Sequence, residues 1–281
     1  MASHIKNVSF YYRSDNTPAE HWAEKLRKWI KSKHSDVQLN DKKPELLIVM
    51  GGDGTVLEAA KAYGSKSNPL ILGLNLGHVG FLTSVREPKN FLPALDKFFR
   101  NKYSVVERMV LSVSVIRNGK NIFTSEALNE AVIHNLLGMV DVDVQIDGTV
   151  IKELRGSGVM VSTATGSTAY NLSAHGPIFE PDIKCIILTE LLSHDVPSPS
   201  IVFKYSKELH FKIKSFRKRG LVSINGSKDK ADVILMTDGD KLFPLEEKDT
   251  IVVKNSSHLV RFVEFEKNYF FKSLKEKFSI K

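Results

Sequence analysis

The sequence predicts an α/β domain followed by a domain of antiparallel β-strands. Length is the first observation, because 281 residues are enough for about two domains of ordinary size. Periodicity is the second: helical spacing alternates with short apolar runs as far as residue 103, and a period of two follows. We therefore place the domain boundary near residue 105.

The first predicted helix begins at residues 17–20 (TPAE). In this interpretation Thr17 is the N-cap, Pro18 takes the first helical position and Glu20 completes a capping box. The hydrophobic residues behind it recur at helical spacing and form one stripe: Trp22, Leu26, Trp29 and Ile30.

A strand–helix–strand unit follows this helix. Residues 46–50 form an unbroken apolar run, typical of a central strand of a parallel sheet with both faces covered. A glycine-rich turn, a helix over 55–63 and a second apolar run over 70–74 complete the unit. A further helix is expected over 88–100, where Pro93 fits only the first turn. These elements predict a Rossmann-like α/β domain.

The period then changes to two. Apolar and polar residues alternate over 111–116 and 141–146. The dipeptides that typically form hairpin turns are Asn118-Gly119, Asp147-Gly148, Asn225-Gly226 and Asp238-Gly239. Short alternating strands joined by such turns predict a β-sandwich-type domain.

Composition narrows the class of protein. The chain is 42% hydrophobic and 26% charged, as in ordinary soluble proteins. Lys and Arg number 40 against 32 Asp and Glu, and the net charge of +8 suits an anionic partner. The single cysteine, Cys185, excludes a disulfide framework. No apolar run approaches the ~18 residues of a membrane span, so we expect a cytoplasmic protein that does not bind membranes.

The strongest chemical signal is the loop Gly51-Gly52-Asp53-Gly54-Thr55, between a strand and a helix. Glycines let the backbone approach a ligand, and N–H groups at a helix N-terminus bind anions such as nucleotide phosphates. Asp53 would repel phosphate, which indicates another purpose, such as accepting a proton or holding a metal. The alternative is that Asp53 or Thr55 caps the helix.

Three other segments carry weaker signals. Residues 75–82 (NLGHVGFL) follow the next strand, so they should line the same crevice as the glycine loop. Residues 163–173 (TATGSTAYNLS) offer small hydroxyl groups and the stacking face of Tyr170. Asn129 and Glu130 form a polar pair in an apolar stretch, which a ligand could satisfy. An ordinary turn and an internally satisfied pair remain the alternatives.

These motifs together resemble those of the NAD kinase family, in the same order, and residues 270–278 resemble that family's C-terminal segment. The resemblance implies ATP-dependent phosphorylation of the 2′-hydroxyl on the adenosine ribose of NAD, giving NADP. It implies Mg²⁺ brought with ATP, and a homodimer or homotetramer. It also implies a phosphate-donor domain of residues 1–105, to which 264–281 return, and an NAD-binding domain of residues 106–263.

The resemblance also implies roles for single residues. Asp53 would be the general base, and Gly51, Gly52, Gly54 and Thr55 would shape the phosphate-facing loop. The residues implied to hold NAD are Asn129, Glu130, Arg155, Thr168, Ala169, Tyr170 and Ser173. No residue is implied as a resident metal ligand. Ser157 departs from the family, which usually has an aspartate there.

Two alternatives stay open at this point. A lipid kinase or other small-molecule kinase could use the same glycine loop, although the motifs at 129–130 and 168–173 would then be unexplained. A nucleic-acid-binding protein would explain the basic run over 204–219. That run has no interleaved stacking aromatic residues and suits a solvated hairpin better, so we expect no nucleic-acid partner.

Overall fold

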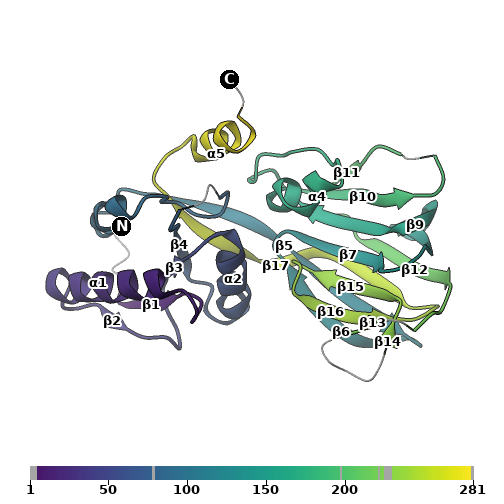
Figure 1. Ribbon diagram of the computed structural model, residues 1–281, viewed down its shortest axis with the longest axis horizontal. Coiled ribbons are helices and arrows are strands. Elements are labelled where there is room, and N and C mark those ends of the chain that lie inside the picture. Colours follow the sequence, from purple (N-terminus) through teal and green to yellow (C-terminus); the bar gives the residue numbers. More distant parts are fainter. Residues whose placement is uncertain (1–4, 78–79, 197, 221, 225–229, 280–281) are drawn as a thin grey trace. The chain divides into compact units, whose positions relative to one another are not determined.

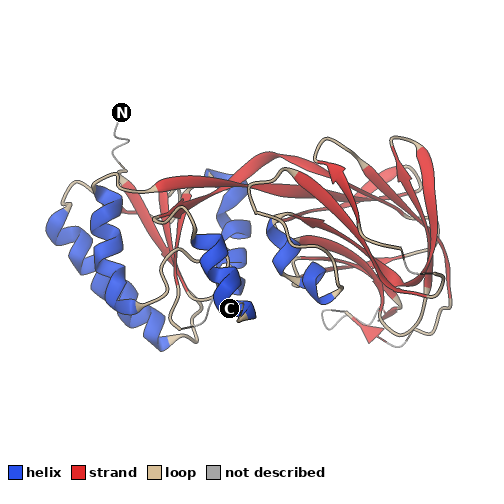
Figure 2. Cartoon of the chain, turned by 90° about the horizontal axis from the view of Figure 1, so that it is seen from above, coloured by secondary structure: helices blue, strands red, loops and turns tan. Residues whose placement is uncertain are grey.

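The computed structural model describes residues 5–77, 80–196, 198–220, 222–224 and 230–279. The chain divides into two compact units (Figure 1). The first unit consists of Met1–Arg108 and Leu259–Lys281, and the second consists of Met109–His258. Helices are concentrated in the first unit, and strands dominate the second (Figure 2).

The first unit is built on a parallel sheet in the order β17-β4-β3-β1-β2. Its strands are β1 (Asn7–Tyr11), β2 (Gln38–Leu39), β3 (Leu46–Met50), β4 (Leu70–Leu74) and the end of β17 (Thr250–Glu264). Every residue of β3 and β4 is buried, as their unbroken apolar runs predict. Arg261 of β17 pairs with Leu70 of β4, so the C-terminal part of the chain returns to this unit.

The helical segments of the first unit are α1 (Thr17–Lys33), α2 (Asp53–Ser67), η1 (Pro88–Asn90), α3 (Phe91–Phe99) and α5 (Tyr269–Phe278). The expected cap of α1 is wrong by one residue. Asn16 is the N-cap, and its Oδ1 accepts a hydrogen bond of 3.1 Å from the backbone N–H of Ala19. Asparagine caps at least as well as threonine, which makes Thr17 the first helical residue. Leu26 and Ile30 are fully buried, whereas Trp22 and Trp29 pack at the edge of the core.

The second unit is antiparallel, in the order β16-β15-β7-β9-β8-β12-β17, with β10 on β9, β11 on β10 and β5 on β6. A two-stranded sheet pairs β13 with β14. The strands not yet bounded are β5 (Ser104–Arg117), β6 (Lys120–Ala127), β7 (Glu130–Asn135), β8 (Val140–Ile146), β9 (Thr149–Thr163), β10 (Cys185–Ser193), β11 (Ile201–Lys204), β12 (Leu209–Phe216), β13 (Val222–Ser223), β14 (Lys230–Ala231), β15 (Val233–Thr237) and β16 (Lys241–Leu245). Two short helical turns, η2 (Thr165–Thr168) and α4 (Tyr170–Ser173), follow β9.

Three of the predicted hairpin turns have the backbone that a type I′ turn needs. The dipeptides Asn118-Gly119, Asp147-Gly148 and Asp238-Gly239 all have positive φ at both residues. The fourth predicted turn, Asn225-Gly226, lies outside the described residues. The predicted fold class, an α/β domain followed by a β domain with a returning C-terminal segment, is confirmed.

Candidate active site

A glycine turn joins the end of β3 to the start of α2. Gly51 has a φ of +153°, and a Cβ there would lie 2.5 Å from Oγ1 of Thr55, so the turn requires glycine at this position. Gly52 is the N-cap of α2, and no side chain among the described residues caps it. Because Asp53 and Thr55 both lie within the helix, the alternative that either is its N-cap is wrong.

The carboxylate of Asp53 is held by the backbone of a second loop. Its Oδ2 accepts a hydrogen bond of 2.8 Å from Phe81 N, and its Oδ1 accepts one of 3.0 Å from Leu82 N. Gly80 makes room for it, since a Cβ on Gly80 would stand 2.2 Å from Oδ1. The two glycine-containing loops, which we expect to line one crevice, are therefore in direct contact at these residues.

The second loop is fixed by Asn75, which is buried at the end of β4. Its Oδ1 accepts a hydrogen bond of 3.2 Å from Gly77 N, and its Nδ2 lies 3.5 Å from Oγ1 of Thr83. Residues 78 and 79 lie outside the described residues. The described part of the loop therefore has internal hydrogen bonds, one of which reaches Thr83, the residue next to the donors to Asp53.

A cation that is not part of any of the sequence motifs lies beside the glycine turn. Arg13 follows β1, and its Nη2 lies 3.8 Å from the position that a Cβ on Gly54 would take. Its Nε donates a hydrogen bond of 3.2 Å to Oε2 of Glu58 on α2, and this bond raises the pKa of Arg13. Apolar and polar residues alternate in the segment before the first helix. This alternation was the available signal for the strand β1, and a strand there would place Arg13 just beyond its carboxyl end.

In the second unit, Asp238 anchors the segment that contains Asn129 and Glu130. Its carboxylate accepts hydrogen bonds from the backbone N–H groups of Leu128, Asn129 and Glu130, over 2.9, 2.7 and 3.1 Å. Both side chains of the predicted polar pair are buried. The sequence pattern predicts Asp238 only as a turn residue, and its bonds to residues 128–130 are visible only in the folded structure.

The turn after β9 packs against the same segment. Oγ1 of Thr163 donates a hydrogen bond of 2.6 Å to Leu128 O, and Oγ of Ser162 donates one of 3.2 Å to Asn129 O. Gly166 approaches so closely that a Cβ on it would lie 2.2 Å from Asn129 O. The structure therefore brings the predicted polar pair and the Thr/Ser-rich turn together.

Exposure divides the residues of this turn into two groups. Asn171 is fully buried, where its Nδ2 donates a hydrogen bond of 3.0 Å to Pro177 O and its Oδ1 accepts one of 2.8 Å from Thr189. Thr165 and Ser167 are buried too. The predicted binding residues reach the surface: Thr168, Ala169 and Tyr170 are partly exposed and Ser173 is exposed.

The structure does not bring Arg155 into this cluster. Arg155 pairs with Asp141 across β8 and β9, with 3.6 Å between its Nε and Oδ1 of Asp141. It lines a separate pocket of about 300 Å³ in the second unit. Ser162 lies seven residues further along β9, which is about 23 Å in an extended strand.

Two features are absent from the part of the chain that the structure describes. It contains no group of three or more His, Cys, Asp or Glu side chains that could hold a metal ion. None of its helices combines the length and the apolar character needed to span a membrane.

Comparison with known families gives two matches that together cover most of the chain. Residues 3–103 match the ATP-NAD kinase N-terminal domain, and residues 128–265 match the ATP-NAD kinase C-terminal domain. An NAD kinase of Lachnospira eligens is 32% identical over 246 residues, covering 87% of this chain and 83% of that protein. An NAD kinase of Geobacter sulfurreducens is 35% identical over 235 residues, covering 83% of this chain and 78% of that protein.

Solved structures share the fold. Yeast NADH kinase complexed with NADH superposes with a TM-score of 0.86 at 20% identity, covering 98% of this chain and 88% of that one. An NAD kinase from Archaeoglobus fulgidus in complex with ATP gives a TM-score of 0.73 at 23% identity, covering 99% of this chain and 100% of that one.

Proposed function

We infer the function of this chain from its family: it belongs to the NAD kinase family and is a phosphotransferase that makes NADP from NAD. The comparisons favour this function over the lipid kinase and the nucleic-acid-binding protein that the sequence left open. We propose ATP as the phosphoryl donor and the 2′-hydroxyl of the adenosine ribose as the acceptor.

The observation that carries the mechanism is the fixed carboxylate of Asp53. In the proposed reaction the 2′-oxygen attacks the γ-phosphorus of ATP, the bond from that phosphorus to the β,γ-bridging oxygen breaks, and ADP leaves. The proton of the 2′-hydroxyl moves to Asp53. A carboxylate oxygen can accept two hydrogen bonds, so each oxygen of Asp53 keeps an acceptor position beside its backbone donor. A general base of this kind contributes typically ~10²–10⁴-fold.

The triphosphate belongs, in this proposal, at the turn before α2. The N-terminal end of α2 carries a partial positive charge and N–H groups that suit phosphate oxygens. Gly51, Gly52, Gly54 and Thr55 shape the turn, and Arg13 adds a full positive charge beside Gly54. Mg²⁺ would arrive bound to ATP and neutralise charge on the transferring phosphoryl group.

NAD recognition is assigned to residues of the second unit. Asn129 and Glu130 supply an amide and a carboxylate on a segment that Asp238 holds rigid. Thr168, Ala169, Tyr170 and Ser173 add hydroxyl groups, backbone groups and a stacking face. We also propose Arg155 as a contact of NAD on the basis of the family resemblance, although within one chain it lies apart from the other residues. A homodimer or homotetramer in the cytoplasm completes the proposal.

The test is an incubation of the purified protein with NAD, Mg²⁺ and a phosphoryl donor, with NADP measured by an NADP-specific dehydrogenase. ATP, another nucleoside triphosphate and polyphosphate are supplied in separate reactions. The proposal expects NADP with ATP and none when donor or Mg²⁺ is omitted. Folded protein that makes no NADP with any of these donors would contradict it.

A further inference from the structure

We propose that the C-terminal helix α5 positions the carboxylate of Asp53, with Arg86 and Tyr269 as positioning residues. The inference rests on the proposed role of Asp53 as the general base. Neither Arg86 nor any residue of α5 has a part in the function proposed above. All of the groups involved lie in the first unit.

Helix α5 packs on the segment that donates hydrogen bonds to Asp53. The ring of Phe81 contacts the ring of Phe270, with 5.8 Å between their centroids. Two residues further on, Oγ1 of Thr83 lies 3.5 Å from the hydroxyl of Tyr269, and both side chains are buried. The segment therefore contacts Asp53 through its backbone and α5 through its side chains.

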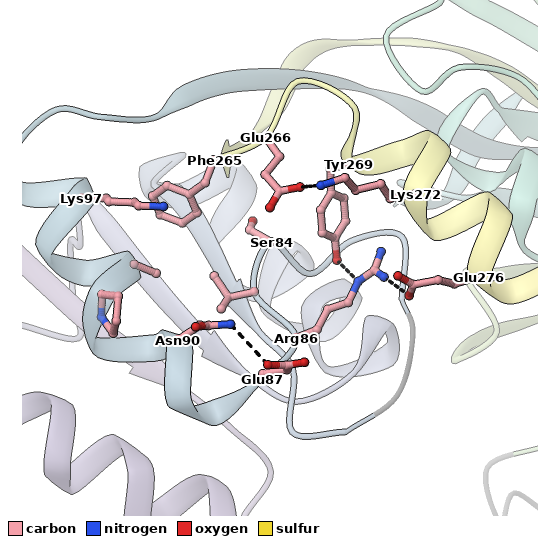
Figure 3. Close-up of a pocket in the computed structure, with 13 residues that line it drawn as sticks. Ser84, Arg86, Glu87, Asn90, Lys97, Phe265, Glu266, Tyr269, Lys272 and Glu276 are labelled. Atoms are coloured by element: carbon pink, nitrogen blue, oxygen red, sulfur yellow. Dashed lines mark hydrogen bonds and ion pairs between the residues drawn. The ribbon is translucent and has the colours of Figure 1, made fainter.

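Arg86 ties the same segment to three side chains of α5, and Figure 3 shows its contacts with two of them, Tyr269 and Glu276. Its Nε donates a hydrogen bond of 3.1 Å to the hydroxyl of Tyr269, and its two Nη groups donate to Oγ of Ser273 and to the carboxylate of Glu276. The guanidinium also stacks on Tyr269, with Cζ 4.6 Å from the ring centroid. Since a guanidinium is a planar fork with fixed donor directions, these contacts set both the distance and the rotation of α5 on the segment.

The consequence for Asp53 follows from its two donors. Phe81 N and Leu82 N can orient the carboxylate only if the segment that carries them is itself fixed. A cavity of about 430 Å³ borders Arg86 and Tyr269, and loosened side chains have room to move into it. Misplacing a reacting group by about 1 Å costs up to ~10²-fold in rate. Loosening α5 should therefore lower kcat, whereas the groups that set KM are elsewhere.

The experiment compares Arg86→Met and Tyr269→Phe with the parent in the full-length protein. Arg100→Met is the matched control, because it removes an exposed arginine that pairs with Asp96 on α3 over 2.8 Å. We expect kcat to fall about 10–100-fold for Arg86→Met and about 3–10-fold for Tyr269→Phe. Both KM values should stay within about twofold and the control should match the parent.

Either of two results would overturn the inference: a kcat like that of the control, or a rise in KM in place of the fall in kcat. If Arg86→Met does not fold, as thermal unfolding would reveal, Tyr269→Phe decides by the same criteria, since it removes one hydroxyl and keeps the ring.

A double substitution distinguishes the positioning role of α5 from the proposed role of Asp53 as the general base. The single-turnover rate of NADP formation is measured for Asp53→Asn and for the double variant that also carries Arg86→Met. The double variant should be slower than Asp53→Asn by less than about twofold. Two losses that multiply would mean that Arg86 acts on something else, and the inference fails. Full activity of Asp53→Asn would refute the base itself. If Asp53→Asn is inactive and Arg86→Met is fully active, only the role of α5 is refuted.

Discussion

Leu82 N donates a hydrogen bond of 3.0 Å to Oδ1 of Asp53, and this contact joins the first turn of α2 to the loop after β4. The adjacent N–H of Phe81 holds the other oxygen. A carboxylate held by two backbone donors points in one direction without depending on a flexible partner side chain. The geometry thus explains how an acidic residue can stand inside a turn that is otherwise suited to phosphate.

Gly80→Ala should damage catalysis through Asp53. A Cβ at this position would lie 2.2 Å from Oδ1, so the carboxylate has to move away from its donors. We expect kcat to fall about 10–100-fold, with a smaller change in either KM. Gly138→Ala is the control, because a Cβ there meets its nearest neighbour at an ordinary 3.5 Å. Equal kcat values for the two variants would show that the position of Asp53 does not depend on Gly80.

Asp238→Asn should weaken NAD binding and reduce stability. Its carboxylate accepts three backbone hydrogen bonds from residues 128–130, and an amide cannot replace all of them. Hydrogen bonds to a charged group contribute about 1.5–3 kcal/mol each, so we expect the free energy of unfolding to fall by at least 1 kcal/mol. The KM for NAD should rise while kcat changes little.

The control for that substitution is Asp147→Asn, which changes an aspartate in the same type of hairpin turn. Asp147 pairs only with the exposed side chain of Lys207 among the contacts described for its carboxylate. Urea denaturation and steady-state kinetics on both variants make the comparison. Equal losses in both would assign the effect to the turn and not to the anchoring of residues 128–130.

Arg13→Ala should raise the KM for ATP. The guanidinium lies beside Gly54 and its pairing with Glu58 is largely exposed, with 53% of the arginine side chain accessible. Exposed pairs contribute at most ~1 kcal/mol, so thermal stability should hardly change. We expect a rise of about 3–10-fold in the KM for ATP, with the KM for NAD unchanged. Arg100→Ala serves as the control, because Arg100 directly follows α3 and pairs with Asp96, and an equal effect there would remove Arg13 from the site.

Much of the fold could be predicted because its central strands are recognisable from local pattern. Residues 46–50 and 70–74 are continuous apolar runs, and both are the fully buried strands β3 and β4. The strand β1 was missed because it is not a continuous apolar run: polar Ser9 lies among its residues, and both end residues are partly exposed. The cap of α1 was displaced by one residue because Asn16 and Thr17 are adjacent and both are good N-caps.

The candidate site was predictable only where its residues are adjacent in sequence. The turn at 51–55 and the pair Asn129-Glu130 carry their own local signal. The contact of Asp238 with residue 129 joins positions 109 residues apart, and the contacts of Arg86 with α5 span more than 180 residues. Such pairs depend on the tertiary fold, which a pattern of local periodicity does not encode.

In the proposed mechanism Asp53 accepts the proton of the 2′-hydroxyl. Asp53→Asn keeps the size of the side chain and removes its charge, so the most direct test is NADP formation by this variant together with calorimetric titration of NAD. We expect kcat to fall by about 10²–10⁴-fold while the Kd for NAD stays within about threefold of the parent. A variant whose kcat stays close to that of the parent would contradict this mechanism, because the proton would then be accepted elsewhere.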